Sequence, residues 1–233
     1  MISVAMATYN GEKYIKKQLI SVLKNISADD EIVISDDGSN DKTLDIIYSF
    51  RDQRIKVFKG EGKGINKNFA NAISKCNGDY IFLCDQDDYW YSNKISIVMD
   101  VFKRENCVLV VHDARIVNEK DEVIFDSFFD HRIMKKGIFN NWLKNCYHGC
   151  LMAFKKSIID QILPIPSKGG FHDQWIGIIA EMTGEVYFLN KKLMDYYRRN
   201  DNASCFKGIS TGKRIYNRFW LLLNLINFRF VRK

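Results

Sequence analysis

Residues 80–91 read Tyr-Ile-Phe-Leu-Cys-Asp-Gln-Asp-Asp-Tyr-Trp-Tyr, an apolar run that ends in three carboxylates within four positions. The apolar run predicts a buried strand, whereas clustered acids repel one another and are costly to remove from water. We therefore expect a cation beside Asp85, Asp87 and Asp88. Carboxylate oxygens favour Mg²⁺ or Mn²⁺, whose shells are usually completed by water and substrate phosphates. The alternative is a solvated acidic turn, because acids are also common at helix N-termini.

Strand-like and helix-like stretches alternate around this segment. Short apolar strands are expected at 2–7, 31–35, 55–58, 80–84 and 107–111. A helical pattern of apolar residues follows each of the first four, and Asn10 is placed to cap the first of these helices. The alternation predicts an α/β fold with a Rossmann-like, mostly parallel sheet flanked by helices on both faces.

Three polar clusters fall at the ends of expected strands, at residues 8–10, 36–39 and 85–88. In open sheets of this kind, ligands bind beyond the carboxyl ends of the strands. We therefore expect the three clusters to converge on one crevice.

The second half of the chain is less regular. A short strand is expected at 123–125, an apolar segment at 149–154, and a helix at 156–163 that Pro164 stops. A further helix is expected from about 174 to 183. Asp173 stands just before it, either as a simple N-cap or as a functional carboxylate.

Composition and cysteine usage limit the class of protein. The chain has 233 residues, 46% of them hydrophobic, which is enough for one large domain. Neither a signal peptide nor a membrane-spanning stretch is recognisable, so a cytoplasmic protein is expected. Cys146, His148 and Cys150 alternate and would share one face of a strand. Three neighbouring ligands on one strand fit a tetrahedral zinc shell poorly, so we predict no metal there.

Four motifs resemble those of family 2 glycosyltransferases with the GT-A fold. They are Thr-Tyr-Asn-Gly at 8–11, Ser-Asp-Asp-Gly-Ser-Asn-Asp at 35–41, Gly-Asp-Tyr-Ile-Phe-Leu-Cys-Asp-Gln-Asp-Asp-Tyr-Trp at 78–90 and His-Asp-Gln-Trp at 172–175. The Asp-Gln-Asp-Asp form, the Lys67-Asn68-Phe69 element and the His-Asp-Gln-Trp segment look most like bacterial rhamnosyltransferases of cell-surface polysaccharide assembly. The resemblance implies a GT-A domain over 1–206, with a nucleotide-binding half (1–112) and an acceptor-binding half (113–206).

The resemblance also implies roles for individual residues. Nucleotide-binding residues would be Thr8, Tyr9, Asn10, Asp37, Asn68, Asp85 and Gln86. Asp37 would accept the N3–H of uracil or thymine. Asp87 would bind the Mn²⁺ or Mg²⁺ directly, and Asp85 would contact the ribose or a water of the metal. Asp173 would be the general base that deprotonates the acceptor hydroxyl, so that transfer inverts the anomeric carbon without a covalent intermediate.

Some features depart from the family pattern. A His that often follows the last core strand is replaced by Tyr197-Arg198-Arg199-Asn200, where Arg198 or Arg199 can pair with the diphosphate. The Gln-x-x-Arg-Trp motif of processive polymerases is absent, which favours one sugar per encounter. His172 either orients the acceptor or packs beside the base. Three tryptophans either form a sugar platform or belong to the core: Trp90, Trp142 and Trp175.

The excess of positive charge lies in the C-terminal tail, after residue 206. The net charge is +7, and seven basic residues with no acidic one follow residue 206, so the other 28 basic residues match the 28 acidic ones. Residues 207–233 therefore predict a basic amphipathic helix. One helical face would carry Ile215, Phe219, Leu222, Leu223 and Ile226. This pattern fits an interfacial helix on an anionic membrane, with Trp220 at headgroup level. The alternative is a helix packed on the domain or in a homodimer.

Together these features predict a metal-dependent inverting glycosyltransferase at the inner face of the cell membrane. The donor would be a dTDP- or UDP-sugar and the acceptor a glycan, lipid-linked in this location; no nucleic-acid motif is present. One alternative is a sugar nucleotidyltransferase, although such enzymes usually carry a Gly-rich loop with a basic residue after the first strand. The other is a non-catalytic nucleotide-sugar-binding module, against which the presence of both Asp87 and Asp173 argues.

Overall fold

The computed structural model describes residues 1–132, 134–199 and 210–231, with side chains described up to residue 228. The strands are β1 (Ile2–Thr8), β2 (Glu31–Asp36), β3 (Ile55–Lys59), β4 (Tyr80–Asp85), β5 (Tyr89–Trp90), β6 (Cys107–Val117), β7 (Val123–Phe125), β8 (Met152–Lys155) and β9 (Glu185–Tyr197). The helices are α1 (Ile15–Leu23), α2 (Thr43–Ser49), α3 (Ile65–Ser74), α4 (Lys94–Arg104), α5 (Phe128–Arg132), α6 (Ile138–Leu143), α7 (Ile159–Ile162), α8 (His172–Thr183) and α9 (Thr211–Val231), with 3₁₀ turns η1 (Gly149–Leu151) and η2 (Lys156–Ile158).

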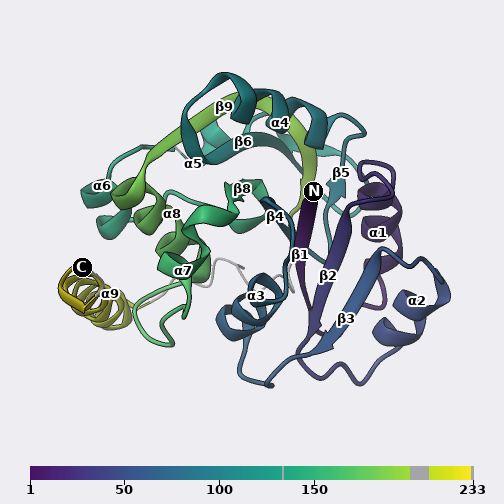
Figure 1. The fold of residues 1–233 in the computed structure, drawn as a ribbon, viewed down its shortest axis with the longest axis horizontal. Helices are drawn as coiled ribbons and strands as arrows, with labels where there is room; N and C mark the ends of the chain where they lie inside the picture. The colour runs from purple at the N-terminus through teal and green to yellow at the C-terminus, as the bar shows by residue number, and fades with distance from the viewer. Residues whose placement is uncertain (133, 200–209, 232–233) are drawn as a thin grey trace.

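The first half of the chain forms the parallel part of the sheet. Strands β3, β2, β1 and β4 are neighbours in this order and all run parallel. The residues of β1, β2 and β4 are almost all buried, as expected for strands covered on both faces. Figure 1 shows α3 on one side of β1–β3 and α1 and α2 on the other. The predicted α/β arrangement of this half is confirmed.

The second half extends the sheet with mixed pairing. Strand β8 runs antiparallel to both β4 and β6, whereas β9 runs parallel to β6 and antiparallel to β5. Neither β5 nor β9 was expected from the sequence. In β9 the register shifts where His112 faces Leu189 and Asp113 faces Lys192, and the exposed Asn190 and Lys191 lie at this shift. These two polar residues interrupt the apolar pattern of β9, so the strand is not recognisable from the sequence.

Asn10 does not cap a helix, contrary to the prediction. Helix α1 begins after Tyr14, and no side chain caps it. Asn10 instead has a left-handed backbone, with φ of 47°. Its backbone N–H donates to Ser39 Oγ at 2.9 Å, and its Oδ1 accepts from the Asn40 N–H at 3.0 Å. Asn10 therefore joins the loop after β1 to the loop after β2.

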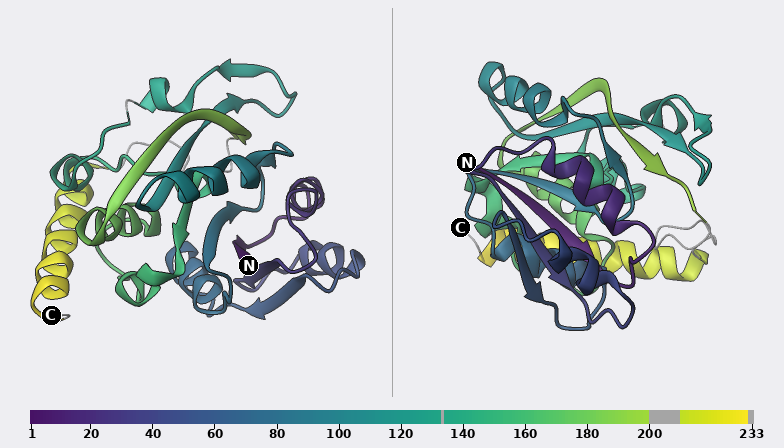
Figure 2. Two further views of the ribbon diagram at one scale, coloured as in Figure 1. Left: turned by 45° about the horizontal axis from the view of Figure 1, so that its top comes forward. Right: turned by 90° about the vertical axis from the view of Figure 1, so that its right-hand side faces the viewer.

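Helix α9 lies along the outside of the domain in every view (Figures 1 and 2). Leu221 and Leu225 are buried, and a Cβ on Gly169 would come within 2.7 Å of the Leu221 backbone. Trp142 Nε1 donates to the Arg218 carbonyl at 3.1 Å. The face that the sequence assigned to a membrane is exposed, and the helix packs on the domain by a different face.

No helix in the described ranges is long and apolar enough to cross a membrane. Some residues named in the sequence predictions fall outside the described part of the chain. These are Asn200 and, within the predicted tail helix at 207–233, residues 207–209, 232 and 233 and the side chains of 229–231.

Candidate active site

The ends of three neighbouring parallel strands meet at one edge of the sheet. In the register of the sheet, Thr8 pairs with Asp36 and Ala7 pairs with Asp85. The loops that follow are joined by backbone bonds, because the Asp37 N–H donates to the Thr8 carbonyl at 2.9 Å. The Gln86 side chain exchanges two 3.0 Å hydrogen bonds with the Tyr9 backbone, and the Tyr9 ring is exposed. The predicted convergence of the three polar clusters is confirmed.

Asp36 builds the turn after β2, a role that sequence reasoning missed. This carboxylate is buried and accepts from Thr8 Oγ1 at 2.8 Å and from Ser39 Oγ at 2.6 Å. It also accepts from the backbone N–H groups of Gly38 and Ser39. Thr8 is therefore a buried partner of Asp36. Of the two neighbouring carboxylates, Asp36 and Asp37, only Asp37 remains half-exposed.

Asp37 holds the loop at residues 60–64 against the strand ends. Its two oxygens accept from the N–H groups of Gly62 and Gly64, each at 2.8 Å. A Cβ on Gly60 would lie 2.8 Å from Asp37 Oδ1 and 2.9 Å from Asn68 Oδ1, so this position requires glycine. Asn68 donates to the Thr8 carbonyl at 3.0 Å, while its buried Oδ1 has no hydrogen-bond partner among the described residues. The loop and Asn68 thus form one wall beside the strand ends.

The acidic cluster carries excess negative charge. Asp88 is only 2% exposed; its Oδ1 accepts from the Tyr197 N–H at 3.1 Å, and its Oδ2 has no hydrogen-bond partner among the described residues. Burial raises the pKa of Asp88, and the charges of Asp87 and Asp85 raise it further. The pKa of Asp85 is raised by burial and then by Asp87 and Asp173. Neither Asp85 nor Asp88 has an ion-pair partner among the described residues, although the Cys150 thiol lowers the pKa of both and the Lys94 charge lowers that of Asp85. Buried carboxylates with so little compensating charge fit a divalent cation.

Asp87 is already paired with a cation from the protein. Arg199 Nη1 lies 2.9 Å from Asp87 Oδ2 and also donates to the Asp87 carbonyl at 2.7 Å. Arg199 is 8% exposed, with its guanidinium 4.0 Å from the Tyr14 ring centre and 4.6 Å from that of Tyr197. Of the two predicted diphosphate contacts, Arg199 faces the acidic cluster. Arg198 is exposed and lines a hollow with Arg132 and His148.

Asp173 lies in the first turn of α8 and is 6% exposed. The helix is preceded by Phe171, so the reading of Asp173 as the N-cap is wrong. Its Oδ1 accepts from Asn145 Nδ2 at 2.9 Å and from the Gln174 N–H at 2.7 Å. Burial raises the pKa of Asp173 to about 6, against these two hydrogen bonds, which lower it. A carboxylate with such a pKa suits proton transfer near neutral pH.

His172 and Trp175 are packed in the protein interior. The His172 ring stacks on Phe69 at 4.1 Å, and burial lowers its pKa to about 3, so the ring is neutral. Trp175 is 5% exposed and donates to the Ile162 carbonyl at 2.8 Å. Trp90 is fully buried, and Trp142 is bonded to α9. The burial of Trp90 and Trp175 favours the core reading of these tryptophans, and the acceptor contact of Trp175 stays a prediction.

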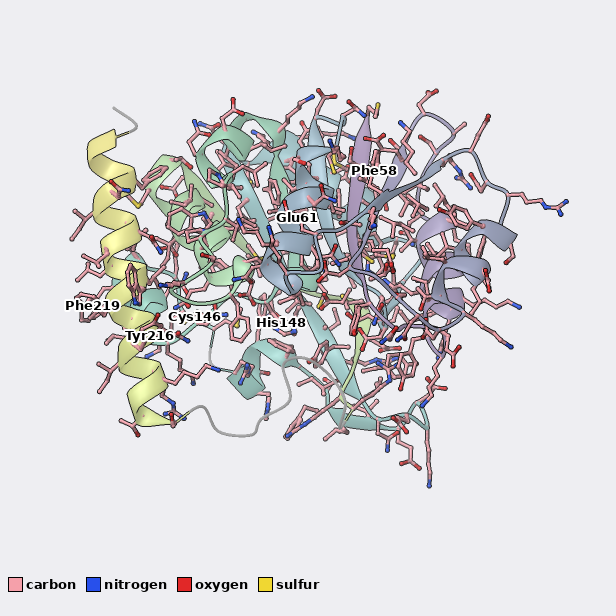
Figure 3. All side chains as sticks on the ribbon, turned by 90° about the horizontal axis from the view of Figure 1, so that it is seen from below. Phe58, Glu61, Cys146, His148, Tyr216 and Phe219 are labelled. Atoms are coloured by element: carbon pink, nitrogen blue, oxygen red, sulfur yellow. The ribbon has the colours of Figure 1, made fainter. Side chains whose placement is uncertain are left out.

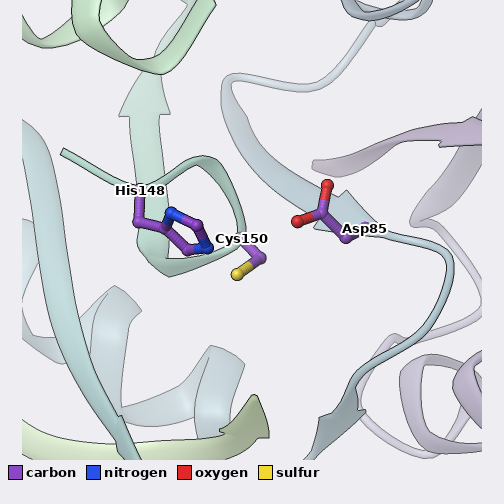
Figure 4. Close-up of side chains that lie close together, drawn as sticks. All are labelled: Asp85, His148 and Cys150. Carbon is purple, nitrogen blue, oxygen red and sulfur yellow. The ribbon is translucent and has the colours of Figure 1, made fainter. Parts of the chain in front are cut away.

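The structure places two of the alternating cysteine and histidine residues beside Asp85. Residues 149–151 form a 3₁₀ turn rather than a strand. Cys146 bonds to the Lys144 carbonyl, whereas His148 and Cys150 turn toward Asp85 (Figure 4). The ligand atoms of Asp85, His148 and Cys150 all lie within 4.8 Å of one another. Sequence reasoning missed this group because Asp85 is distant along the chain.

Comparison with known proteins identifies the relatives of this chain. Residues 3–163 match the family described as Glycosyl transferase family 2. The dTDP-rhamnosyl transferase RfbG of Shigella flexneri is 30% identical over 94% of this chain and 79% of its own length. The UDP-Glc:alpha-D-GlcNAc-diphosphoundecaprenol beta-1,3-glucosyltransferase WfgD of Escherichia coli is 29% identical over 78% of this chain and 70% of its own length.

Solved structures share the fold. A crystal structure of S. aureus TarS in complex with UDP-GlcNAc superposes with a TM-score of 0.76 at 20% identity, over 97% of this chain. The mannosyltransferase PcManGT from Pyrobaculum calidifontis, in complex with GDP-Man and Mn²⁺, gives 0.68 at 16% identity, over 96% of this chain. The chain spans 66% and 64% of the length of these two solved chains. The GT-A fold expected from the motifs is confirmed.

Proposed function

The chain belongs to glycosyl transferase family 2, and on this premise we propose that it transfers a sugar from a dTDP- or UDP-sugar to a lipid-linked glycan in cell-surface polysaccharide assembly. The name of one relative supports dTDP-rhamnose as the favoured donor. The name of another supports a UDP-sugar donor and an acceptor linked to diphosphoundecaprenol.

One observation carries the proposal. The ends of β1, β2 and β4 bring Thr8, Asp37 and the acidic cluster of Asp85, Asp87 and Asp88 to one edge of the sheet. Asp173 lies close enough to this edge for its charge to raise the pKa of Asp85. A nucleotide site and a carboxylate base therefore border the same crevice, which is the arrangement that direct sugar transfer requires.

The nucleotide would bind along the wall formed by Asp37, Asn68 and the loop at residues 60–64. Backbone N–H groups of Gly62 and Gly64 orient the Asp37 carboxylate. An ionised carboxylate only accepts hydrogen bonds, so it can read the N3–H of uracil or thymine but not the unprotonated N3 of cytosine. The buried Asn68 Oδ1 offers a further acceptor beside Gly60.

The donor's diphosphate would lie at the acidic cluster. Asp85, Asp87 and Asp88 fit Mn²⁺ or Mg²⁺, which would supply charge neutralisation of the departing nucleoside diphosphate. Arg199 balances Asp87, and its fixed position between two tyrosine rings lets it also approach a phosphate oxygen.

Asp173 would act as the general base. Two hydrogen bonds to Oδ1 orient the carboxylate and leave Oδ2 to take the proton of the acceptor hydroxyl. The hydroxyl then attacks the anomeric carbon on the side opposite the leaving diphosphate, which inverts that carbon. The acceptor itself is the nucleophile, so no side chain forms a covalent intermediate.

Helix α9 would hold the enzyme at an anionic membrane, at the inner face where a lipid-linked acceptor is found. Its outward face exposes Ile215, Phe219 and Leu222, and Tyr216 and Phe219 lie at the edge of the molecule (Figure 3). Lys213 and Arg214 are also exposed, in the first turn of the same helix. A helix with an exposed apolar face and exposed basic residues suits the headgroup region of a bilayer.

Release of nucleoside diphosphate tests the proposal. Purified protein would be incubated with Mn²⁺, a polyprenyl-diphosphate-linked sugar and either dTDP-rhamnose or UDP-glucose. We expect acceptor-dependent release with at least one donor and a product extended by a single sugar. Nucleoside diphosphate release that does not require the acceptor would contradict the proposal. So would transfer of a nucleoside monophosphate group to a sugar phosphate.

A further inference from the structure

Three side chains that can bind a metal ion lie close together where Asp85 of the acidic cluster faces η1. Asp85 is the last residue of β4. Cys150 lies in η1, and His148 is the residue before η1. Their ligand atoms lie within 4.8 Å of one another, and Figure 4 shows the imidazole and the thiol turned toward each other with Asp85 facing them. Tetrahedral Zn²⁺ with bonds of about 2.0–2.3 Å places its ligands about 3.5 Å apart. Small side-chain rotations that move the ligand atoms by about 1 Å would therefore bring all three within bonding distance of one ion.

The chemistry of this ligand set differs from that of the carboxylate cluster. Mg²⁺ and Mn²⁺ prefer oxygen, whereas thiolate and imidazole select softer cations, Zn²⁺ above all. The carboxylate cluster can bind a hard metal through oxygen alone, so the cysteine and the histidine add ligands of a different kind. Three protein ligands also leave one position of a tetrahedral shell open to water or a phosphate oxygen.

Unsatisfied polar atoms provide independent support. His148 Nε2 is buried and has no hydrogen-bond partner in the described part of the chain. The same holds for Asp88 Oδ2. The His148 ring is fixed between Phe128 and Tyr196, each with its ring centre 4.9 Å away.

We propose that Asp85, His148 and Cys150 bind a thiophilic divalent cation of the Zn²⁺ type at the floor of the crevice. Binding releases the thiol proton of Cys150 to solvent, because the thiolate is the ligand. The ion would occupy Asp85 and thereby compete with the Mn²⁺ or Mg²⁺ that the carboxylate cluster would hold for the donor. This last consequence rests on the proposed function, whereas cation binding itself does not.

Optical titration with Co²⁺, in the absence of any nucleotide, tests the proposal on the full chain. We expect one equivalent of Co²⁺ to produce a thiolate-to-metal absorption band in the near ultraviolet, and Zn²⁺ to displace it. Cys150→Ser should abolish the band. Cys76→Ser is the matched control, because Cys76 is a buried thiol at the end of α3 and should leave the band unchanged.

The second variant is His148→Gln, which keeps the thiolate but removes the imidazole ligand. Loss of outer-shell partners alone weakens metal sites about 10–100-fold, so loss of a ligand should weaken Zn²⁺ binding by at least ~100-fold. Absence of the band in the unmodified protein, an unchanged band in Cys150→Ser, or unchanged Zn²⁺ affinity in His148→Gln would overturn the site. If Cys150→Ser does not fold, the His148→Gln affinity decides. The titration contains no donor, so its failure would leave the transferase proposal standing.

Discussion

The guanidinium of Arg199 lies 2.9 Å from the carboxylate of Asp87, in the position where the sequence led us to expect only a metal ion. The Arg199 side chain is 6% exposed and that of Asp87 is 20% exposed. A fixed positive charge therefore balances one member of the acidic cluster, and Asp85 and Asp88 remain without an ion pair in the described part of the chain. A divalent ion would thus be recruited mainly by these two carboxylates.

The first prediction is a strong coupling between Arg199 and Asp87. Arg199→Met keeps much of the packing between the tyrosine rings but leaves Asp87 without its counter-ion. We expect a loss of about 1–3 kcal/mol in the free energy of unfolding, below the figure for fully buried pairs because Asp87 is partly exposed. Adding Asp87→Asn should restore part of this loss. Urea unfolding of the two single variants and the double variant measures the coupling, and additive effects would mean that the pair is energetically unimportant.

The second prediction concerns metal dependence. Asp85→Asn is a cleaner test than Asp87→Asn, because removing the Asp87 charge leaves the buried Arg199 unpaired. The pKa of Asp85 is raised in the folded protein, so its ionised form opposes folding above that pKa, and Asp85→Asn should raise the Tm at pH 8. The same variant should lose Mn²⁺-dependent protection by UDP. EDTA should stop transfer by the unmodified enzyme, and full activity in excess EDTA would exclude a metal requirement.

The third prediction concerns the base of the donor nucleotide. Asp37 should select uracil and thymine, so UDP and dTDP with Mn²⁺ should raise the Tm, whereas GDP and CMP should not. At a ligand concentration of 100 Kd the stabilisation is about 2.7 kcal/mol, which corresponds to about 5–10 °C for a chain of this size. Differential scanning fluorimetry measures the shift, with Mn²⁺ alone as the control. Equal protection by GDP would contradict the role of Asp37.

The sequence predicted the fold of residues 1–112 far better than that of the rest of the chain. Strands β1, β2 and β4 are buried on both faces and read as short apolar runs between helical patterns, so local signals agree with the fold. Strand β9 carries the polar bulge at Asn190 and Lys191, which breaks its apolar pattern. Strand β5 has two residues and exists only because β9 lies beside it. Such elements depend on tertiary pairing, which a local pattern does not encode.

In the candidate site too, features set by local sequence were predicted and features set by tertiary contacts were not. Motif residues that follow strands, such as Asp37 and Asp87, were located correctly because parallel strand ends share one edge of the sheet. The pairing of Asp87 with Arg199 and the approach of Cys150 to Asp85 join segments distant in sequence, so spacing could not indicate them. The tryptophans were ambiguous because an aromatic ring suits both a core and a sugar platform.

The fourth prediction tests Asp173 as the base. Asp173→Asn keeps an oxygen that can accept from Asn145 and the Gln174 N–H, but it cannot take a proton. Turnover should fall by ~100-fold or more, while donor affinity stays nearly unchanged. In the unmodified enzyme, turnover should decline as pH falls below about 6, because the base becomes protonated. Activity within a few-fold of normal in the variant would place the base elsewhere.

Stability provides a second readout for Asp173. Its pKa rises from 3.8 to about 6 on folding, so the folded state favours the protonated form and the unmodified protein loses stability as pH rises through this interval. Asp173→Asn should therefore be more stable than the unmodified protein above pH 6, by up to about 3 kcal/mol, and equally stable near pH 4. An equal difference at both pH values would show that the carboxylate is not the cause.

The fifth prediction concerns the outward face of α9. Truncating the helix would also expose the pocket that holds Leu221, so surface variants give the sharper test. The triple variant Ile215→Ser/Phe219→Ser/Leu222→Ser alters only exposed positions and should keep the fold and donor binding. Tyr48→Ser on α2 is the matched control, because Tyr48 is equally exposed but lies away from α9.

Co-sedimentation with phosphatidylglycerol vesicles at low and high salt separates the two contributions to binding. Each basic residue near the surface contributes about 1 kcal/mol before screening, so Lys213→Glu/Arg214→Glu should weaken binding mainly at low salt. Insertion of Phe219 and its apolar neighbours should leave a salt-resistant fraction that the triple serine variant loses and Tyr48→Ser retains. If none of the proteins sediments, or if the triple variant instead converts a dimer to a monomer in sedimentation velocity, the outward face of α9 contacts protein and the membrane assignment is wrong.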